Sequence, residues 1–369
     1  LGAESVGHRD RLDDGRLAGP VLPDEHGEIA ELEPVPEQLR HGGDRVGPPV
    51  RRDLVVVRAT DGHDRSGVQH GITAHSGHGT FDGMRIHQLN CGTMTGGIPS
   101  RVLLVEAPDH LVLVDTGIGL ADIADPAGRL GPLRHVLRPA LDPAESAVRR
   151  IEALGLDPRD VRHIVLTHFD LDHVGGLADF PEATVHVTAE GLTWAVRTPR
   201  FMERRRYRRS QLAHRPVYAE YEFASDRWEG FRVVPLDHVA PGMMMVDLPG
   251  HTVGHAGVFV PGGGAGGTAG AERAVGTSGA GKNPDEDDDD TGRDILHAGD
   301  AFYHRGQIDP TIRVPAQVGV QERALALQPD SIALTHSGLA ALAARRAESL
   351  DVVCAHDPSG PGRITSDPA

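Results

Sequence analysis

Short apolar runs recur along the chain from residue 84 onward, and most of them are rich in valine, leucine and isoleucine. Runs of this length and composition are typical of buried strands, whereas amphipathic helices carry apolar residues every three or four positions. Two of the runs are separated only by Ala-Pro-Asp-His, which indicates a hairpin. The strands that this pattern predicts cover residues 84–90, 102–106, 111–115, 164–166, 184–188 and 351–357.

One stretch between the predicted strands has the signals of an amphipathic helix. Asp142 is a suitable N-cap, a proline follows it, and Gly155 comes directly after the last apolar residue of the helical pattern. We also expect helices at 189–197 and at 339–348, the latter capped by Ser337. Strands and helices that alternate along the chain predict a sheet covered by helices, which is an α/β fold.

Two segments lack the apolar residues that a core requires. Residues 1–83 are rich in Gly, Pro, Asp, Arg and His, and residues 261–293 are rich in Gly and Ala ahead of an acidic run. Such compositions bury too little apolar area to offset chain entropy. We therefore expect a disordered, dispensable extension, a functional domain at 84–369 that begins near Met84, and a flexible surface loop at 261–293.

The composition restricts the classes of partner. The chain has 369 residues and a formal net charge of -16, and this acidic balance argues against nonspecific binding to nucleic acid. Cys91 and Cys354 form neither a disulfide pattern nor a thiolate-zinc pattern, which fits a reducing cytoplasm. No apolar stretch approaches the roughly 18 residues that span a bilayer. We expect a cytoplasmic protein without a membrane span, and the oligomeric state stays open.

The candidate chemistry begins directly after the apolar run 164–166. The sequence Thr-His-Phe-Asp-Leu-Asp-His at 167–173 places four potential metal ligands within six residues. A buried strand delivers such side chains to the loop at its carboxyl end, where open α/β sheets place their chemistry. Imidazoles and carboxylates suit zinc, iron or manganese, and four such groups would repel one another without a cation. The alternative interpretation is a solvated polar loop.

Residues 168–173 resemble the His-x-His-x-Asp-His signature of the metallo-β-lactamase superfamily, with Asp170 where the second His usually stands. Further segments resemble the same family: Pro-Gly-His-Thr-x-Gly-His at 249–255, a strand-end Gly-Asp at 299–300, and a His-Asp pair at 356–357. The resemblance implies an αββα sandwich, in which two mixed sheets are flanked by helices.

The resemblance also implies a site for two divalent metal ions. Zinc is the expected metal, with iron or manganese as alternatives because the Asp170 carboxylate is a harder ligand than imidazole. If Asp170 cannot reach a metal, one ion per chain is expected. Asp115, in an Asp-Thr-Gly turn, would help to hold the ligand loops. The implied ligands are His168, Asp170 and His251 for one metal, Asp172, His173 and His356 for the second, and Asp300 as the bridge.

These ligands imply a metal-dependent hydrolase in which a metal-bound hydroxide attacks a carbonyl ester. Tyr303 follows Asp300 by three residues, as in the acyl-homoserine lactonases of the family, and we assign catalytic roles to Tyr303 and Asp172. A small-molecule lactone is therefore the favoured substrate. The alternatives are a thioester hydrolase of the glyoxalase II type and a nuclease or phosphodiesterase, followed by a redox di-iron protein and an inactive scaffold.

Other residues compete for functional roles. The basic run at 200–209, interleaved with aromatic residues, is a candidate anion-binding exosite, although a solvated helix face is the commoner explanation. In the family, insertions after the signature often build the wall of the substrate pocket. Four further histidines are expected outside the site or at lower weight: His186 and His297 in strands, His255 as a structural residue, and His336 as a weaker candidate for the last ligand.

Overall fold

The computed structural model describes residues 84–201, 203–262, 287–289 and 292–358. The predicted extension at 1–83 and most of the predicted loop at 261–293 lie outside the described residues, so both stay predictions. In the part of the chain that the structure does describe, no helix combines the length and the apolar character needed to cross a membrane.

The described residues form two mixed sheets. The first has the strand order β11-β1-β2-β3-β4-β5-β6; β3 to β6 run parallel to one another, and its other strands pair antiparallel. The second has the order β13-β12-β10-β9-β8-β7, with only the β12–β13 pair parallel. The strands of the first sheet are β1 (Arg85–Asn90), β2 (Arg101–Glu106), β3 (Leu111–Val114), β4 (Val161–Val165), β5 (Thr184–Thr188), β6 (Val217–Tyr221) and β11 (Asp287–Asp289). The strands of the second are β7 (Arg227–Trp228), β8 (Phe231–Pro235), β9 (Met244–Asp247), β10 (Ala256–Val260), β12 (Asp294–His297) and β13 (Leu350–Val353).

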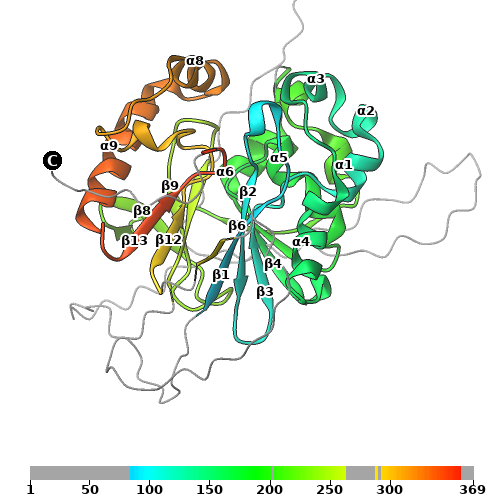
Figure 1. The fold of residues 1–369 in the computed structure, drawn as a ribbon, viewed down its shortest axis with the longest axis horizontal. Helices are drawn as coiled ribbons and strands as arrows, with labels where there is room; N and C mark the ends of the chain where they lie inside the picture. Colours follow the sequence, from blue (N-terminus) through cyan, green and yellow to red (C-terminus); the bar gives the residue numbers. More distant parts are fainter. Residues whose placement is uncertain (1–83, 202, 263–286, 290–291, 359–369) are drawn as a thin grey trace, which may run out of the picture. The chain divides into compact units, whose positions relative to one another are not determined.

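Helices cover the outer face of each sheet (Figure 1). The second sheet is covered by α9 (Pro329–Arg345), and α8 (Ala316–Leu325) lies above it in the view of Figure 1. The predicted αββα sandwich is therefore confirmed. The helices on the side of the first sheet are α1 (Leu120–Ala124), α2 (Pro126–Arg129), α3 (Arg134–Leu137), α4 (Ala147–Ala153), α5 (Leu171–Val174), α6 (Ala189–Leu192) and α7 (Glu203–Arg206).

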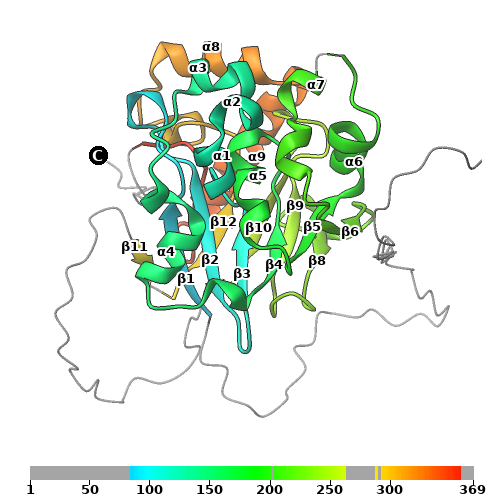
Figure 2. The ribbon, with the colours of Figure 1, turned by 90° about the vertical axis from the view of Figure 1, so that its right-hand side faces the viewer.

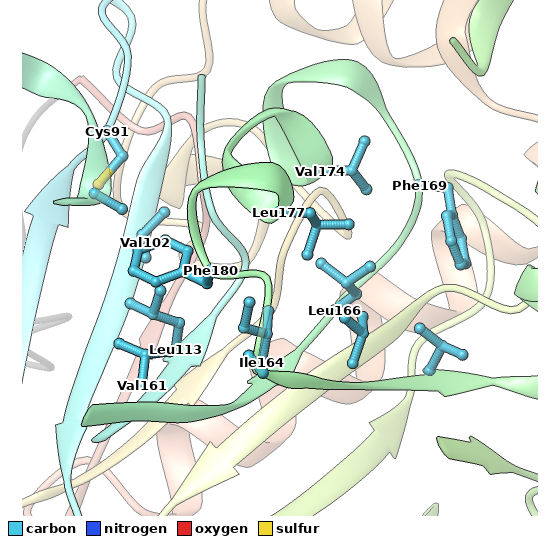
Figure 3. Packing of buried hydrophobic residues seen from close by; sticks show 14 of the residues in the cluster. Cys91, Val102, Leu113, Val161, Ile164, Leu166, Phe169, Val174, Leu177 and Phe180 are labelled. Carbon is cyan, nitrogen blue, oxygen red and sulfur yellow. The ribbon is translucent and has the colours of Figure 1, made fainter. Parts of the chain in front are cut away.

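Alternation along the strands produces the layers. In β2, Val102 and Leu104 face the helices, whereas Leu103 and Val105 face the second sheet. Successive side chains of a strand point to opposite faces, so an entirely apolar strand can bury both faces. Figure 3 shows the helix-facing layer, where residues of the strands meet Leu177 and neighbouring apolar side chains. A third apolar cluster joins the second sheet to α9.

Two predicted helices begin elsewhere. The first starts as a short 3-10 turn capped by Asp142, breaks at Ser146, and continues as α4 from Ala147. Ser146 is extended and caps α4 with its hydroxyl, so it is a better N-cap than Asp142. The predicted cap at Ser337 is wrong: α9 begins at Pro329, and the Ser337 hydroxyl donates to the Ala333 carbonyl inside the helix. This is the back-bonding that serine adopts when it lies within a helix.

A third correction concerns the acidic run. Residues Asp287–Asp289 form β11, which pairs antiparallel with β1 and extends the first sheet. The sequence predicts a flexible surface loop here because the segment is of low complexity and has no periodic apolar face. Without β11, the outer edge of β1 would leave backbone N–H and C=O groups unpaired, and a segment of almost any sequence can pair with them through its own backbone.

A chain of hydrogen-bonded histidines and a tyrosine also lies on the first sheet. His163 Nδ1 lies 2.9 Å from His186 Nε2, and His186 Nδ1 lies 2.8 Å from the Tyr221 hydroxyl. That hydroxyl lies 2.9 Å from His238 Nε2. His186 is buried in β5, as the strand pattern predicts. Burial, together with the nearby charges of His163 and His238, lowers the pKa of His186 to about 3.

This low pKa predicts acid sensitivity. Above the unfolded-state pKa of about 6.5, His186 is neutral in both the folded and the unfolded chain, so it does not make the free energy of unfolding depend on pH. As the pH falls below that value, the unfolded chain binds a proton that the folded chain does not, so stability falls by about 1.4 kcal/mol per pH unit. His186→Gln should reduce the slope of unfolding free energy against pH by an amount equivalent to about one bound proton. The measurement is denaturant unfolding in the presence of chelator between about pH 7 and about pH 5. Equal slopes in the two proteins would contradict the assignment.

Candidate metal centre

The loop between β4 and α5 begins the site, at the end of the strands where α5 and α7 lie (Figure 2). It carries His168 and Asp170. Thr167 fixes its start, because the Thr167 backbone N–H and hydroxyl each donate to the Asp115 carboxylate at 2.8 Å. Asp115 directly follows β3 and has a positive φ of 62°, a conformation that turns the chain sharply and that Asp tolerates better than most residues. Two neighbouring strand ends are thereby tied together.

Three distant segments meet this loop. His251 lies in the turn between β9 and β10, Asp300 follows β12, and His356 follows β13. Gly250 precedes His251 with a φ of 149°, which favours glycine, and this residue allows the tight turn that aims the imidazole inward. The structure therefore brings all seven predicted ligands to one place. Their donor atoms fall into two groups: His168, Asp170, His251 and Asp300, and Asp172, His173 and His356.

Asp300 lies between the two groups. Its Oδ2 is 3.4 Å from His251 Nε2 and 3.9 Å from His168 Nε2. Its Oδ1 is 3.3 Å from His173 Nε2 and 3.1 Å from His356 Nε2. One carboxylate oxygen thus faces each group, which is the placement that a bridging ligand requires. We call His168, Asp170 and His251 the first ligand set, and Asp172, His173 and His356 the second ligand set.

The outer nitrogens of the four histidines are all held by the protein. His173 Nδ1 lies 2.8 Å from the Asp115 carboxylate, and His168 Nδ1 lies 2.9 Å from the Thr167 hydroxyl. His356 Nδ1 lies 2.8 Å from the Pro99 carbonyl oxygen, and His251 Nδ1 lies 2.9 Å from the Tyr303 hydroxyl. Partners on Nδ1 orient each ring, and each Nε2 then faces the centre.

The inward atoms fit a metal. Within the described residues, His168 Nε2, His173 Nε2 and Asp300 Oδ1 are buried and make no hydrogen bond. Buried polar atoms without partners are costly and rare, and a cation between them accounts for all three together. A donor set of four imidazoles and three carboxylates suits zinc and its first-row neighbours.

Comparisons with known proteins agree with this geometry. Residues 95–267 match the family model described as the metallo-beta-lactamase superfamily. A probable metallo-hydrolase of Mycobacterium tuberculosis is 44% identical over 279 residues, which cover 74% of this chain and 81% of that protein. The chain belongs to the metallo-β-lactamase superfamily. It is therefore a metal-dependent hydrolase.

This superfamily member is also similar to a lactonase in sequence and to a solved structure in fold. The N-acyl homoserine lactonase AttM of Rhizobium johnstonii is 30% identical over 179 residues, which cover 48% of this chain and 66% of that protein. A solved structure described as "Indirect contributions of mutations underlie optimization of new enzyme function" superposes with a TM-score of 0.50 at 16% identity, over 76% of this chain and 94% of that one. At that identity the superposition supports the fold alone.

Two carboxylates of the metallo-hydrolase centre are held in the ionised form. Burial raises the pKa of Asp300, but the charges of His356, His173 and His251 outweigh it and hold the pKa well below the usual range. Asp115 behaves in the same way. Burial raises its pKa, but His173, together with His297 and His168, lowers it by more. Ionised carboxylates at the centre attract a cation.

Asp170 has a partner that the sequence did not predict. Arg206 of α7 donates from Nε to Asp170 Oδ1 and from Nη2 to Asp170 Oδ2, each at 2.5 Å. Burial raises the pKa of Asp170, but the Arg206 charge lowers it well below its usual range. The sequence predicts an anion-binding exosite or a solvated helix face for the basic run at 200–209. One sequence signal could have indicated this pair. Asp170 places a negative charge where the family has a neutral imidazole, and a nearby arginine, here Arg206, can compensate that charge.

The remaining histidines that the sequence singled out lie outside both sets. His255 Nε2 accepts from the Asp300 backbone N–H at 3.1 Å, and its Nδ1 lies 3.0 Å from the Leu248 carbonyl oxygen. His297 Nε2 lies 3.0 Å from the Arg101 carbonyl oxygen. His336 Nε2 lies 3.0 Å from the Ala301 carbonyl oxygen. Each is occupied by hydrogen bonds that support the fold.

Tyr303 lies at the centre, as the spacing from Asp300 predicts. Its side chain is buried, its hydroxyl contacts His251, and its ring stacks on that of His356 with centroids 5.8 Å apart. Burial and the Asp300 carboxylate raise the pKa of Tyr303 well above the usual range. The phenol is therefore an O–H donor at neutral pH.

Proposed function

We propose that this metallo-hydrolase holds two divalent metal ions and opens lactones. The observation that carries the proposal is the position of Asp300, with one carboxylate oxygen toward each ligand set. The first ligand set would hold one ion and the second ligand set the other. Zinc is the metal that we propose, because four of the seven donors are imidazoles; iron or manganese is the alternative, since Asp170 makes the first set harder.

Two ions held in this way would supply an activated water and polarise the substrate carbonyl. The residues do the rest. Asp172 lies 3.4 Å from His356 at the second ligand set, and we assign its carboxylate the proton that the attacking water loses. The Tyr303 hydroxyl faces the first ligand set, and it can donate a hydrogen bond to the oxygen on which negative charge develops during ring opening.

A lactone is proposed because of Tyr303 and because relatives at 30% identity include an N-acyl homoserine lactonase. The nuclease alternative has less support than the lactonase. It requires the basic run at 200–209 as a nucleic-acid exosite, and arginines of this run contact neighbouring groups of the protein. Arg200 lies over the Trp194 ring at 4.5 Å, and Arg205 lies over the Phe201 ring at 5.0 Å.

The test is a side-by-side assay of the zinc-reconstituted chain against lactones, thioesters and phosphodiesters. We expect lactones to have the highest kcat/KM. Tyr303→Phe should lower kcat for lactones by about 100-fold to 1,000-fold, because it removes one oxyanion donor, with a smaller change in KM. A higher kcat/KM for thioesters or phosphodiesters would reject the lactone proposal. Unchanged kcat in Tyr303→Phe would remove the hydroxyl from the mechanism.

A further inference from the structure

Arg206 is the feature that the proposed reaction leaves without a role. Its neighbours in the basic run contact other groups: Arg204 Nε donates to the Pro199 carbonyl, and Arg208 Nε donates to the Arg129 carbonyl. The Arg206 side chain instead turns into the centre, where only 17% of it is exposed.

The Arg206 guanidinium is held from three directions. Its fork binds both oxygens of Asp170. Nη1 donates to the Leu325 carbonyl, at the end of α8, at 2.5 Å. Nη2 also lies 2.8 Å from His251 Nε2. A bidentate arginine fixed to a second element in this way has a defined position and is not a loosely placed surface side chain.

These contacts use the same atoms that a metal would need. Nη2 reaches both Asp170 Oδ2 and His251 Nε2, which are two donors of the first ligand set. A guanidinium has five N–H donors and no lone pair, so it cannot itself be a ligand. Because Nη2 lies 2.8 Å from His251 Nε2 and 2.5 Å from Asp170 Oδ2, a metal ion held by these two atoms would compete with Arg206 for their lone pairs.

The second ligand set is different because its donors have no arginine contact among the described residues. His173 Nε2 and the facing Asp300 Oδ1 are buried and make no hydrogen bond there, whereas in the first set only His168 Nε2 is left in that state and Arg206 occupies Asp170 and His251. The net charge of the first set also depends on Arg206. The Asp170 carboxylate and the Arg206 cation sum to zero, which is the charge of a neutral imidazole. Unlike a free imidazole, however, the Asp170 oxygens already accept hydrogen bonds from Arg206.

We infer that Arg206 is an internal cation that competes with the metal ion of the first ligand set, so that the two ligand sets bind metal with unequal affinity. The inference rests on the proposed two-metal centre. It assigns the tight ion to the second ligand set and makes filling of the first set depend on displacement of the guanidinium from His251.

The experiment is a zinc titration of the full chain, stripped of metal, against a chromophoric chelator. We expect two zinc ions, the second at least about tenfold weaker, because a cation at hydrogen-bond distance opposes a second one. Arg206→Met should tighten the weaker zinc by about tenfold or more and leave the tighter one unchanged. Arg205→Met, which removes an exposed arginine from the same helix, is the matched control and should change neither.

Two results would overturn the inference: equal affinities in the parent chain, or a weaker second zinc in Arg206→Met. The latter would make Arg206 a residue that positions Asp170. If Arg206→Met does not fold, Arg206→Gln gives the same decision, since its amide can still donate to Asp170 without a charge. Absence of zinc from every variant, in folded protein, would instead reject the two-metal function itself.

Discussion

Replacing Asp300 with alanine is expected to abolish hydrolysis, with a loss of at least about a thousandfold in kcat/KM, because both proposed metal positions lose a shared ligand. The Asp300 carboxylate faces His251 on one side and His356 on the other, so no single neighbouring side chain can replace it. Bound zinc, measured by mass spectrometry after gel filtration, should fall below one ion per chain.

Asp294→Ala is the matched control for this change. Asp294 begins β12, whereas Asp300 follows the end of the same strand, and its carboxylate pairs with Arg346 at 2.9 Å. It should retain zinc and activity. If Asp300→Ala kept two zinc ions per chain, or kept full activity, the bridging role would be wrong.

The second large effect is expected at Asp115. Its carboxylate receives the Thr167 backbone N–H, the Thr167 hydroxyl and the outer side of the His173 ring, all at 2.8 Å. Asp115→Ala leaves these buried groups without an acceptor and places alanine at a positive φ. We expect the free energy of unfolding in chelator to fall by about 3 to 5 kcal/mol. Zinc affinity should fall by about 10-fold to 100-fold.

Asp115→Asn separates the two effects. Asparagine tolerates the left-handed backbone and can still accept from Thr167, but it has no charge to hold His173. It should lose most of the zinc affinity and less of the stability. Denaturant unfolding in chelator and zinc competition in buffer measure the two quantities independently. A midpoint for Asp115→Ala equal to that of the parent would show that the tie between β3 and the ligand loop is not important for stability.

The sequence predicted the parts of this protein that depend on local pattern. Apolar runs gave the strands, because a strand buried on both faces must be apolar throughout. His168, His251, Asp300 and His356 each follow a strand or lie in a turn between strands, and a resemblance supplied their grouping. The predicted ligand assignments stay predictions until metal is measured, although the structure brings their donor atoms together.

What the sequence could not give depends on pairing between distant segments. Arg206 meets Asp170 only because the short helix α7 turns one of several arginines inward, and no periodicity in the run distinguishes Arg206 from its neighbours. The pairing of Asp287–Asp289 with β1 depends on the backbone edge that β1 offers and not on side chains. The start of α9 was missed because serine is more often a cap than an interior residue.

The residues of the second ligand set are far apart in the sequence, and this separation affects the order of events during folding. Asp172 and His173 lie in α5, whereas His356 is delivered by β13, which joins the sheet beside β12. Closing so long a segment is slow compared with forming the local turn at α5. If the second ligand set holds the tighter ion, as we propose, its capture is expected late in folding, and the moment at which zinc becomes resistant to chelator would time the docking of the last strand.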